Sequence, residues 1–297
     1  MSDAANEIGA HVSNAGGVQH APARAAQLGA SVFQVFTKQA ARWAEPELTD
    51  DAVAAFAAAS HDAGIVIRSA HDSYLINLAS PDDALRTRSL ASFIAELERC
   101  ERLGIELLVS HPGNATDGDL SSGIDRNAEA ITHALETVGG RTMVLLETTA
   151  GSGTSIGGSF EQLARIIDRA GASAAARIGV CLDTCHVWSA GYDIVNAYRD
   201  VFVQLDDCLG LDRLRMFHLN DSATPFASRR DRHADIGMGS IGDEPFRRIV
   251  TDSRFLNVPK VIETPKLPDV LTADLRNLAR LRAFRTADPV QGRAGAG

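Results

Sequence analysis

Eight short runs of apolar and β-branched residues recur along the chain, and this recurrence constrains the fold more than any other feature. In chain order they read IGAHV, SVFQVFT, IRSAHD, LLVSHPG, MVLLETT, IGVCLDT, RMFHLND and PKVIETP. Runs of this length and composition predict buried β-strands. The segments between them are rich in alanine or have helical spacing, so the chain alternates strand and helix.

The helical segments support the same alternation. Over residues 85–103 apolar side chains repeat every three or four positions, Pro81 and two aspartates precede the repeat, and Gly104 follows it. A second helix is expected over residues 50–63. No G-x-G-x-x-G follows the first run, which argues against a dinucleotide-binding sheet. Eight strand–helix units favour an α/β fold of the (β/α)8 TIM-barrel type. We expect one domain over residues 1–286 and a disordered tail over 287–297.

Composition excludes several classes of protein. No stretch approaches the length of apolar sequence that crosses a membrane. The N-terminus lacks the basic start and apolar core of a secretory signal. Four cysteines in 297 residues do not make a disulfide framework, so a cytoplasmic protein is expected. The net charge of −9 argues against non-specific binding to nucleic acid, although bound cations would change that balance.

The last six predicted strands each finish in a residue that can bind a metal ion. These residues are His71, His111, Glu147, Asp183, His218 and Glu263. In a barrel of this type the C-terminal mouth of the strands holds the active site, and there the six side chains would converge. Just beyond the strand ends lie His186, Asp231 and His233. A single strand-end histidine or aspartate usually caps a helix, but six at equivalent positions favour a shared site.

The nine residues predict a site for several metal ions. Five imidazoles and four carboxylates without a thiolate suit zinc, and also manganese or iron. Nine ligands exceed the need of one ion and suit two or three. Three divalent ions would outweigh the four carboxylates, and a positive mouth suits an anionic substrate. Cys181 alternates with Asp183 and is expected to fill the barrel interior, while Cys185 lies in the following turn and is not required as a ligand.

An ordered set of motifs identifies a family resemblance. The motifs are IGAHVSNAGG, FTK, HDSYLINL, HPG, ETTAG, GVCLDTCH with AGYD, HLND, DRH and IETP. They span most of the chain, and together they resemble endonuclease IV, the zinc-dependent apurinic/apyrimidinic endonuclease family of base-excision repair, AP endonuclease family 2. The resemblance implies a hydrolase that cleaves the DNA phosphodiester 5′ to an abasic site. The products would be a 3′-hydroxyl and a 5′-deoxyribose phosphate, and blocked 3′ ends would also be trimmed.

The resemblance implies three zinc ions per chain, with manganese or iron as alternatives for part of the set. His71, His111 and Glu147 would hold the first ion. Glu147 would bridge to a second ion, completed by Asp183, His218 and Glu263. His186, Asp231 and His233 would hold the third. The implied nucleophile is a hydroxide held between two of the metal ions, with Glu147 as the catalytic bridging ligand, and no side chain attacks the phosphate.

The implied partner is double-stranded DNA that contains abasic sites or blocked 3′ ends, bound by a monomer. Tyr74 and Leu75 match family residues that intrude into the DNA stack. Phosphate contacts are expected from the positions Lys38, Arg42, Arg229, Arg230 and Arg232. The chain departs from the family pattern at Ala41, where an arginine is frequent, and at Met238, where GMG replaces GEG.

Two other functions fit parts of the pattern. A sugar isomerase or epimerase of the same barrel type would use one or two metal ions at similar strand ends. It would not need the group of His186, Asp231 and His233. A zinc-stabilised DNA-binding module would close each ion with four protein ligands, usually including cysteine, whereas two of the groups here have three.

Overall fold

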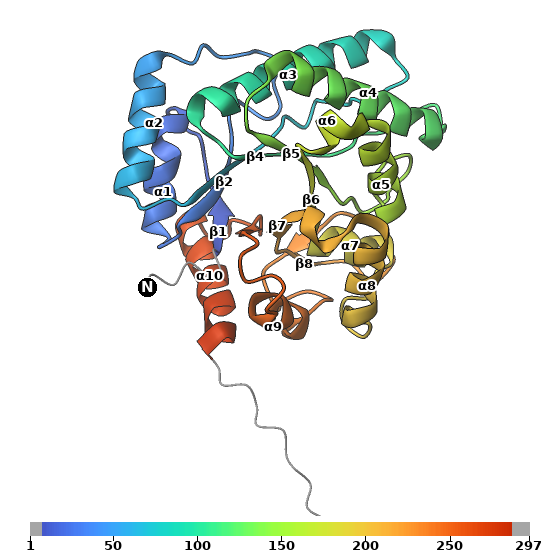
Figure 1. Ribbon diagram of the computed structural model, residues 1–297. Coiled ribbons are helices and arrows are strands. Elements are labelled where there is room, and N and C mark those ends of the chain that lie inside the picture. The colour runs from blue at the N-terminus through green and yellow to red at the C-terminus, as the bar shows by residue number, and fades with distance from the viewer. Residues whose placement is uncertain (1–7, 287–297) are drawn as a thin grey trace, which may run out of the picture.

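Eight parallel strands close into a barrel in the computed structural model, which describes residues 8–286 (Figure 1). The strands are β1 (Ile8–His11), β2 (Val32–Phe36), β3 (Ile67–His71), β4 (Leu107–Ser110), β5 (Met143–Glu147), β6 (Ile178–Asp183), β7 (Leu214–His218) and β10 (Lys260–Ile262). Each predicted run overlaps one of them, and only β7 begins before its run, by one residue. Strand β1 pairs with both β2 and β10, which closes the barrel. The expected tail over 287–297 lies outside the described residues.

Helices surround the strands as an outer ring (Figure 1). They are η1 (Val18–His20), α1 (Ala21–Gln27), α2 (Asp50–Asp62), α3 (Asp83–Leu103), α4 (Leu120–Val138), α5 (Phe160–Arg169), α6 (Gly171–Ala175), α7 (Thr184–Ala190), α8 (Tyr198–Leu209), η2 (Leu211–Arg213), α9 (Asp243–Thr251) and α10 (Val270–Thr286). The order of strand and helix confirms the predicted single-domain (β/α)8 barrel. Within residues 8–286 no helix is long and apolar enough to cross a membrane.

The two helices predicted in detail begin and end for identifiable reasons. The carboxylate of Asp82 accepts hydrogen bonds from the backbone N–H groups of Ala84 and Leu85 at the start of α3. Gly104 ends α3 in the left-handed conformation, with φ 65°. At the start of α2 the hydroxyl of Thr49 accepts from the N–H of Ala52. Both helix predictions are confirmed to within two residues.

The barrel interior is a packed core. Its buried side chains come from alternate positions on the strands: Val32, Leu107, Val109, Leu145, Cys181, Met216 and Val261. Cys181 is therefore a small apolar filler, as the alternation along β6 predicts. A larger core lies between the outer face of the strands and the helices. Because the strands are parallel, their polar C-terminal ends lie at one face of the barrel, and the packed interior closes the barrel below that face.

A short antiparallel pair shapes the mouth between β7 and α9. Strand β8 (Asp221–Ser222) pairs with β9 (His233–Ala234), with Ser222 opposite His233. The Asp221 carboxylate accepts N–H bonds from Gly239, Ile241 and Gly242. A Cβ on Gly239 would lie 2.3 Å from the Ser222 carbonyl oxygen, so only glycine fits there. The HLND and GMG motifs thus hold the loop that carries His233.

Candidate metal centre

All nine predicted ligands lie at the mouth of the barrel and fall into adjacent groups. One group is His71, His111 and Glu147, and another is Glu147, Asp183, His218 and Glu263. A further group joins Asp183, His186 and His233, and another joins Cys185, Asp231 and His233. Within each group the possible ligand atoms lie within 4.8 Å of one another. His111 and Glu263 lie one residue beyond β4 and β10, rather than at the last strand residue.

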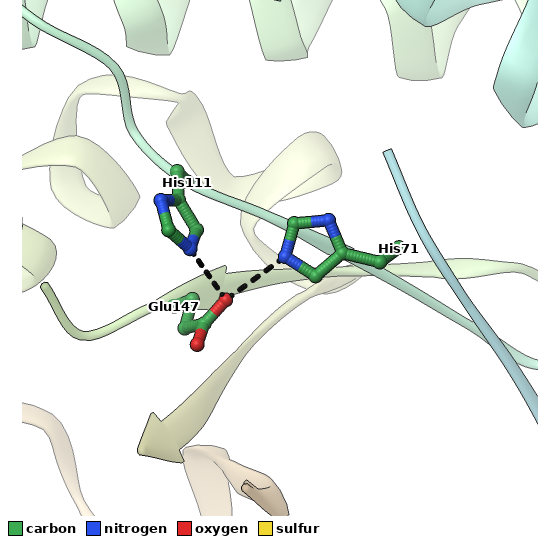
Figure 2. Close-up of side chains that lie close together, drawn as sticks. All are labelled: His71, His111 and Glu147. Carbon is green, nitrogen blue, oxygen red and sulfur yellow. Dashed lines mark hydrogen bonds and ion pairs between the residues drawn. The ribbon is translucent and has the colours of Figure 1, made fainter. Parts of the chain in front are cut away.

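Two imidazoles face one oxygen of Glu147 in the first group (Figure 2). His71 Nε2 lies 3.0 Å from Glu147 Oε2, and His111 Nε2 lies 2.9 Å from the same oxygen. The other carboxylate oxygen, Oε1, lies 2.9 Å from His218 Nδ1. Each oxygen of Glu147 therefore serves a different group, as a bridging ligand requires.

The remaining donors enclose the second group and continue into the third. His218 Nδ1 lies 3.2 Å from Glu263 Oε2. Asp231 faces two imidazoles, with Oδ2 3.1 Å from His186 Nε2 and Oδ1 3.2 Å from His233 Nε2. Asp183 Oδ2 lies 3.7 Å from His233 Nε2, so Asp183 stands between the second and third groups. The sequence analysis assigned Asp183 to the second ion and His186 to the third, but in the structure Asp183 lies close to both groups.

Cys185 lies nearer the site than the sequence indicated. It belongs to the first turn of α7 rather than to a turn before that helix. Its thiol donates to the Arg232 carbonyl oxygen at 3.6 Å. Burial, followed by the nearby Asp183 carboxylate, raises the pKa of the Cys185 thiol to about 11. A protonated thiol is a poor metal ligand, and the imidazole and carboxylate groups remain the stronger donor set.

Carbonyl oxygens on the far side of the rings fix the orientation of the imidazoles. Nδ1 of His71 donates to the Asp72 carbonyl at 2.9 Å, Nδ1 of His186 to the Thr148 carbonyl at 2.8 Å, and Nδ1 of His233 to the Glu263 carbonyl at 3.2 Å. His218 is turned the other way, and its Nε2 donates to Gln34 Oε1 at 2.8 Å. A carbonyl oxygen only accepts, so the proton sits on that nitrogen and the other nitrogen faces the carboxylates.

The nitrogens that face the carboxylates need either a proton or a metal ion. Burial by itself lowers the pKa of His233, but Asp183 and Asp231 raise it to about 9. Burial raises the pKa of the Glu147 carboxyl, yet His111 and His218 hold it well below its usual range. His233 Nε2 is also buried without a hydrogen-bond partner, although Asp231 lies close. Paired charges and an unpartnered imidazole nitrogen at one site fit divalent cations.

Two polar side chains that sequence analysis missed hold the carboxylates in place. Gln34 donates to Glu263 Oε1 at 2.7 Å while it accepts from His218. Asn220 donates to Asp183 Oδ2 at 2.6 Å and accepts from the N–H of Glu263 at 2.8 Å. Both are fully buried. Gln34 is an amide within the apolar run of β2, and Asn220 follows the end of β7 within HLND, so the available signal was an amide within or just after an apolar strand.

A pocket of about 300 Å³ opens above the ligands. His11 and Lys266 line it together with Tyr74 and the outer ligands, and neither was singled out from the sequence. His11 Nδ1 lies 3.2 Å from Glu263 Oε1, and burial lowers the pKa of this imidazole. Lys266 is the lysine of the pocket wall, and its ammonium pairs with the buried Asp274.

Most of the predicted DNA-contact residues are exposed, and Tyr74 among them lines the pocket. Tyr74 is 70% exposed, and its ring packs edge-on against Phe36 with centroids 5.1 Å apart. Leu75 is half-buried. The exposed arginines are Arg42, Arg229, Arg230 and Arg232. Arg229 donates to the Gly151 carbonyl oxygen at 3.0 Å, so its guanidinium also ties two loops together.

The prediction of a phosphate contact at Lys38 is wrong for the structure described. Lys38 is 3% exposed. Its ammonium donates to Glu45 Oε1 at 2.6 Å and to the Ser92 hydroxyl at 2.6 Å. The side chain points under its own loop rather than toward the mouth. Lys38 therefore anchors the loop.

The fold and the donor set define a class: a (β/α)8 barrel whose mouth can hold several divalent cations. The family described as xylose isomerase-like TIM barrel matches residues 22–281. A protein of Chloroflexus aggregans called probable endonuclease 4 is 48% identical over 280 residues, which cover 93% of this chain and 97% of the relative. The chain belongs to the endonuclease 4 family.

Solved structures agree with this assignment. Endonuclease IV of Thermus thermophilus superposes with a TM-score of 0.84 and 35% identity, over 94% of this chain and 98% of that one. D-psicose 3-epimerase of Clostridium cellulolyticum has a TM-score of 0.62 and 17% identity, over 94% and 95% of the two chains. The epimerase shares the fold alone, so the sugar-isomerase alternative gains no support beyond the barrel.

Proposed function

We propose that this protein is a DNA-repair endonuclease that hydrolyses the phosphodiester 5′ to an abasic site. The products are a 3′-hydroxyl and a 5′-deoxyribose phosphate, and the same centre trims blocked 3′ ends. One observation carries the proposal: the nine imidazole and carboxylate residues converge at the barrel mouth in a chain of the endonuclease 4 family. The partner is double-stranded DNA with such lesions.

The donor groups are proposed to hold three zinc ions, with manganese or iron able to replace part of the set. The first ion is assigned to His71, His111 and Glu147. The second is assigned to Glu147, Asp183, His218 and Glu263, and the third to His186, Asp231 and His233, with Asp183 close by. When bound, zinc supplies Lewis-acid polarisation of a phosphoryl oxygen and lowers the pKa of water. Three protein ligands leave positions open for water and substrate.

The residues of the chain contribute orientation and charge. The carbonyls of Asp72 and Thr148 and the amide of Gln34 keep ring protons away from the centre, so the facing nitrogens stay available as ligands. Four carboxylates carry −4 and three divalent ions +6, so the loaded centre is positive on an acidic protein. A positive spot of this kind attracts the phosphodiester backbone.

The exposed side chains around the pocket are proposed to hold the DNA. Tyr74 and the neighbouring Leu75 would enter the stack at the lesion, where no base has to be unstacked. Arg42, Arg229, Arg230 and Arg232 would contact phosphates. A single barrel with an open mouth suits action as a monomer. All four cysteines are free, which suits the reducing cytoplasm expected for this protein.

The test uses a labelled duplex with one tetrahydrofuran abasic analogue, and the same duplex with a normal nucleotide as control. We expect one incision, 5′ to the analogue, with a 3′-hydroxyl on the upstream fragment. Brief EDTA without magnesium should leave most of the incision intact, and prolonged treatment with a zinc chelator should remove it. A zinc-loaded protein that leaves the abasic strand whole but epimerises a ketose would overturn the proposal in favour of the sugar enzyme.

A further inference from the structure

A cluster of four charged side chains lies beneath the loops that follow β2 and β3, with three of them buried and Glu45 at its exposed edge. Lys38 and Glu45 belong to the β2 loop, and Glu96 and Arg99 belong to α3. Glu96 is fully buried, and Lys38 and Arg99 nearly so. The cluster pairs two carboxylates with two cations. Burying charges is unfavourable even when they are paired. The presence of this network beside two loops near the site therefore suggests that it has a function.

Glu96 bonds to both loops through its two oxygens. Its Oε1 accepts from the backbone N–H of Ser73 at 3.0 Å, and its Oε2 accepts from the Thr37 hydroxyl at 3.0 Å. Ser73 follows β3 and precedes the exposed Tyr74, while Thr37 follows β2 directly. A single carboxylate therefore fixes the distance between the starts of the two loops.

The two loops are also joined directly above Glu96. The Ser73 hydroxyl donates to the Ala40 carbonyl oxygen at 2.6 Å, and the N–H of Tyr74 donates to the same oxygen at 3.1 Å. Ala40 lies two residues before the exposed Arg42. Tyr74 and Arg42 thus extend from one hydrogen-bonded unit rather than from two independent loops.

The outer part of the β2 loop is fastened to the same helix. Lys38 Nζ donates to Glu45 Oε1 at 2.6 Å, and Arg99 Nη1 donates to Glu45 Oε2 at 2.7 Å. Farther out, the Arg88 guanidinium stacks over the Trp43 ring, 4.5 Å from its centroid. Arg42 lies between these attachment points. Helix α3 therefore supports the loop on both sides of the residue proposed to contact DNA.

We propose that Glu96 is a positioning residue which holds the Tyr74 and Arg42 loops as one rigid surface for entry into damaged DNA. This inference rests on the proposed function. Extruding a nucleotide is unfavourable, and the side chains that replace it offset that cost best when they are already ordered. Glu96 contacts neither the metal ligands nor the substrate, so its effect is expected on DNA binding and distortion rather than on the chemistry.

The test variant is Glu96→Asp, which keeps the charge but shortens the side chain by one methylene, so both loops can no longer be reached. The matched control is Glu101→Asp on the same helix. Glu101 also accepts two backbone N–H bonds, from Arg141 and Thr142, but these belong to the connection that precedes β5. Glu96→Gln keeps the length and one oxygen that can accept from the Ser73 N–H, while its amide NH2 can donate to the Thr37 hydroxyl oxygen, so it should lose less than Glu96→Asp.

Three readouts separate positioning from general damage. For Glu96→Asp, KM for the abasic duplex should rise about tenfold while kcat changes by less than about threefold. The rate of hydrolysis of bis-p-nitrophenyl phosphate should match that of the wild type, because this small diester does not require Tyr74 and Arg42 to enter a DNA duplex. A 2-aminopurine opposite the lesion should show a smaller fluorescence rise on binding. Glu101→Asp should behave as wild type in all three.

Two results with Glu96→Asp would contradict the positioning role. It is overturned if Glu96→Asp incises the duplex with wild-type KM, or if duplex and small diester lose activity equally. Hydrogen–deuterium exchange separates this from a failure of the proposed function. If the wild-type protein does not incise abasic DNA, the loops over residues 37–49 and 72–77 should still exchange faster in Glu96→Asp than in Glu101→Asp. Unchanged exchange would remove the positioning role altogether.

Discussion

The inner and outer parts of the candidate metal centre differ in how their side chains are held. The side chains of Glu147, Asp183 and His218 are 0% exposed, whereas those of His111 and Asp231 are 41% and 49% exposed. Buried hydrogen bonds hold the inner donors, and the outer ones extend from loops at the edge of the pocket. Under the proposed function, the inner donors would set the positions of the metal ions, and the outer donors would leave room for water and DNA.

The largest effect is expected at the centre of the inner set. Glu147→Gln keeps the shape but removes the charge that both neighbouring groups share. Incision should fall by at least about 10³-fold, because two ions lose a common ligand. Zinc bound per chain, measured by mass spectrometry, should fall as well. The control is Glu129→Gln on the exposed face of α4. A Glu147→Gln protein with full zinc content and wild-type incision would contradict the bridging assignment.

A smaller effect is expected at His186, which is buried but faces the outer carboxylate of Asp231. His186→Ala removes an imidazole that faces Asp231 and leaves Glu147 intact. Single-turnover incision should fall by about 10²- to 10³-fold, with loss of about one zinc ion and an unchanged circular dichroism spectrum. His61→Ala, at an exposed histidine of α2, is the control. If His186→Ala incises DNA as fast as the wild type, no third ion acts in the reaction.

The residues that orient the ligands should matter less than the ligands themselves. Asn220→Ala removes the donor to Asp183 and the acceptor for the Glu263 N–H. Losses of about 10- to 100-fold in zinc affinity or incision are typical when such partners are removed. Competition with a chelating dye measures the affinity. Asn220→Asp should bind zinc more weakly than the wild type because a new negative charge faces Asp183; equal affinity in all three proteins would remove the orienting role.

The smallest effect is expected at the protein surface. Arg42→Gln should raise KM for the abasic duplex a few-fold at moderate salt and leave kcat unchanged. The slope of log affinity against log salt concentration should fall by about one, as expected for one lost phosphate contact. Arg169→Gln on the outer helix α5 is the control, at a side chain 60% exposed. An unchanged salt slope would place Arg42 outside the DNA interface.

The ligands could be predicted from the sequence because strand ends in a barrel converge, whatever the details of the loops. The positions of His71 and Asp183 at the mouth could be predicted from the two-residue period of a strand and from the direction of the chain alone. The direction of Lys38 could not be predicted in the same way, because the local sequence around a lysine just past a strand end is the same whether its side chain points to solvent or beneath its loop. Its burial depends on Glu45 of the same loop and on Ser92 of α3, while Arg99 of α3 holds Glu45 in place.

The supporting network was hidden for a related physical reason. Gln34 and Asn220 act through hydrogen bonds to residues 229 and 37 positions away, and no local pattern reports such contacts. The place of Asp183 between two groups was also unpredictable, since it depends on the angle at which the His233 loop crosses the mouth. Sequence analysis therefore predicted which residues meet, and the structure added what holds them there.

The most direct test of the account is a zinc titration of the metal-free protein. The protein is stripped with dipicolinate, zinc is added in measured equivalents, and incision of the abasic duplex is followed at each step. With a three-ion centre, full incision should need about three equivalents of zinc, and Glu147→Gln and His186→Ala should not reach it. Full incision by the stripped protein, or a plateau at one equivalent, would contradict the three-ion centre.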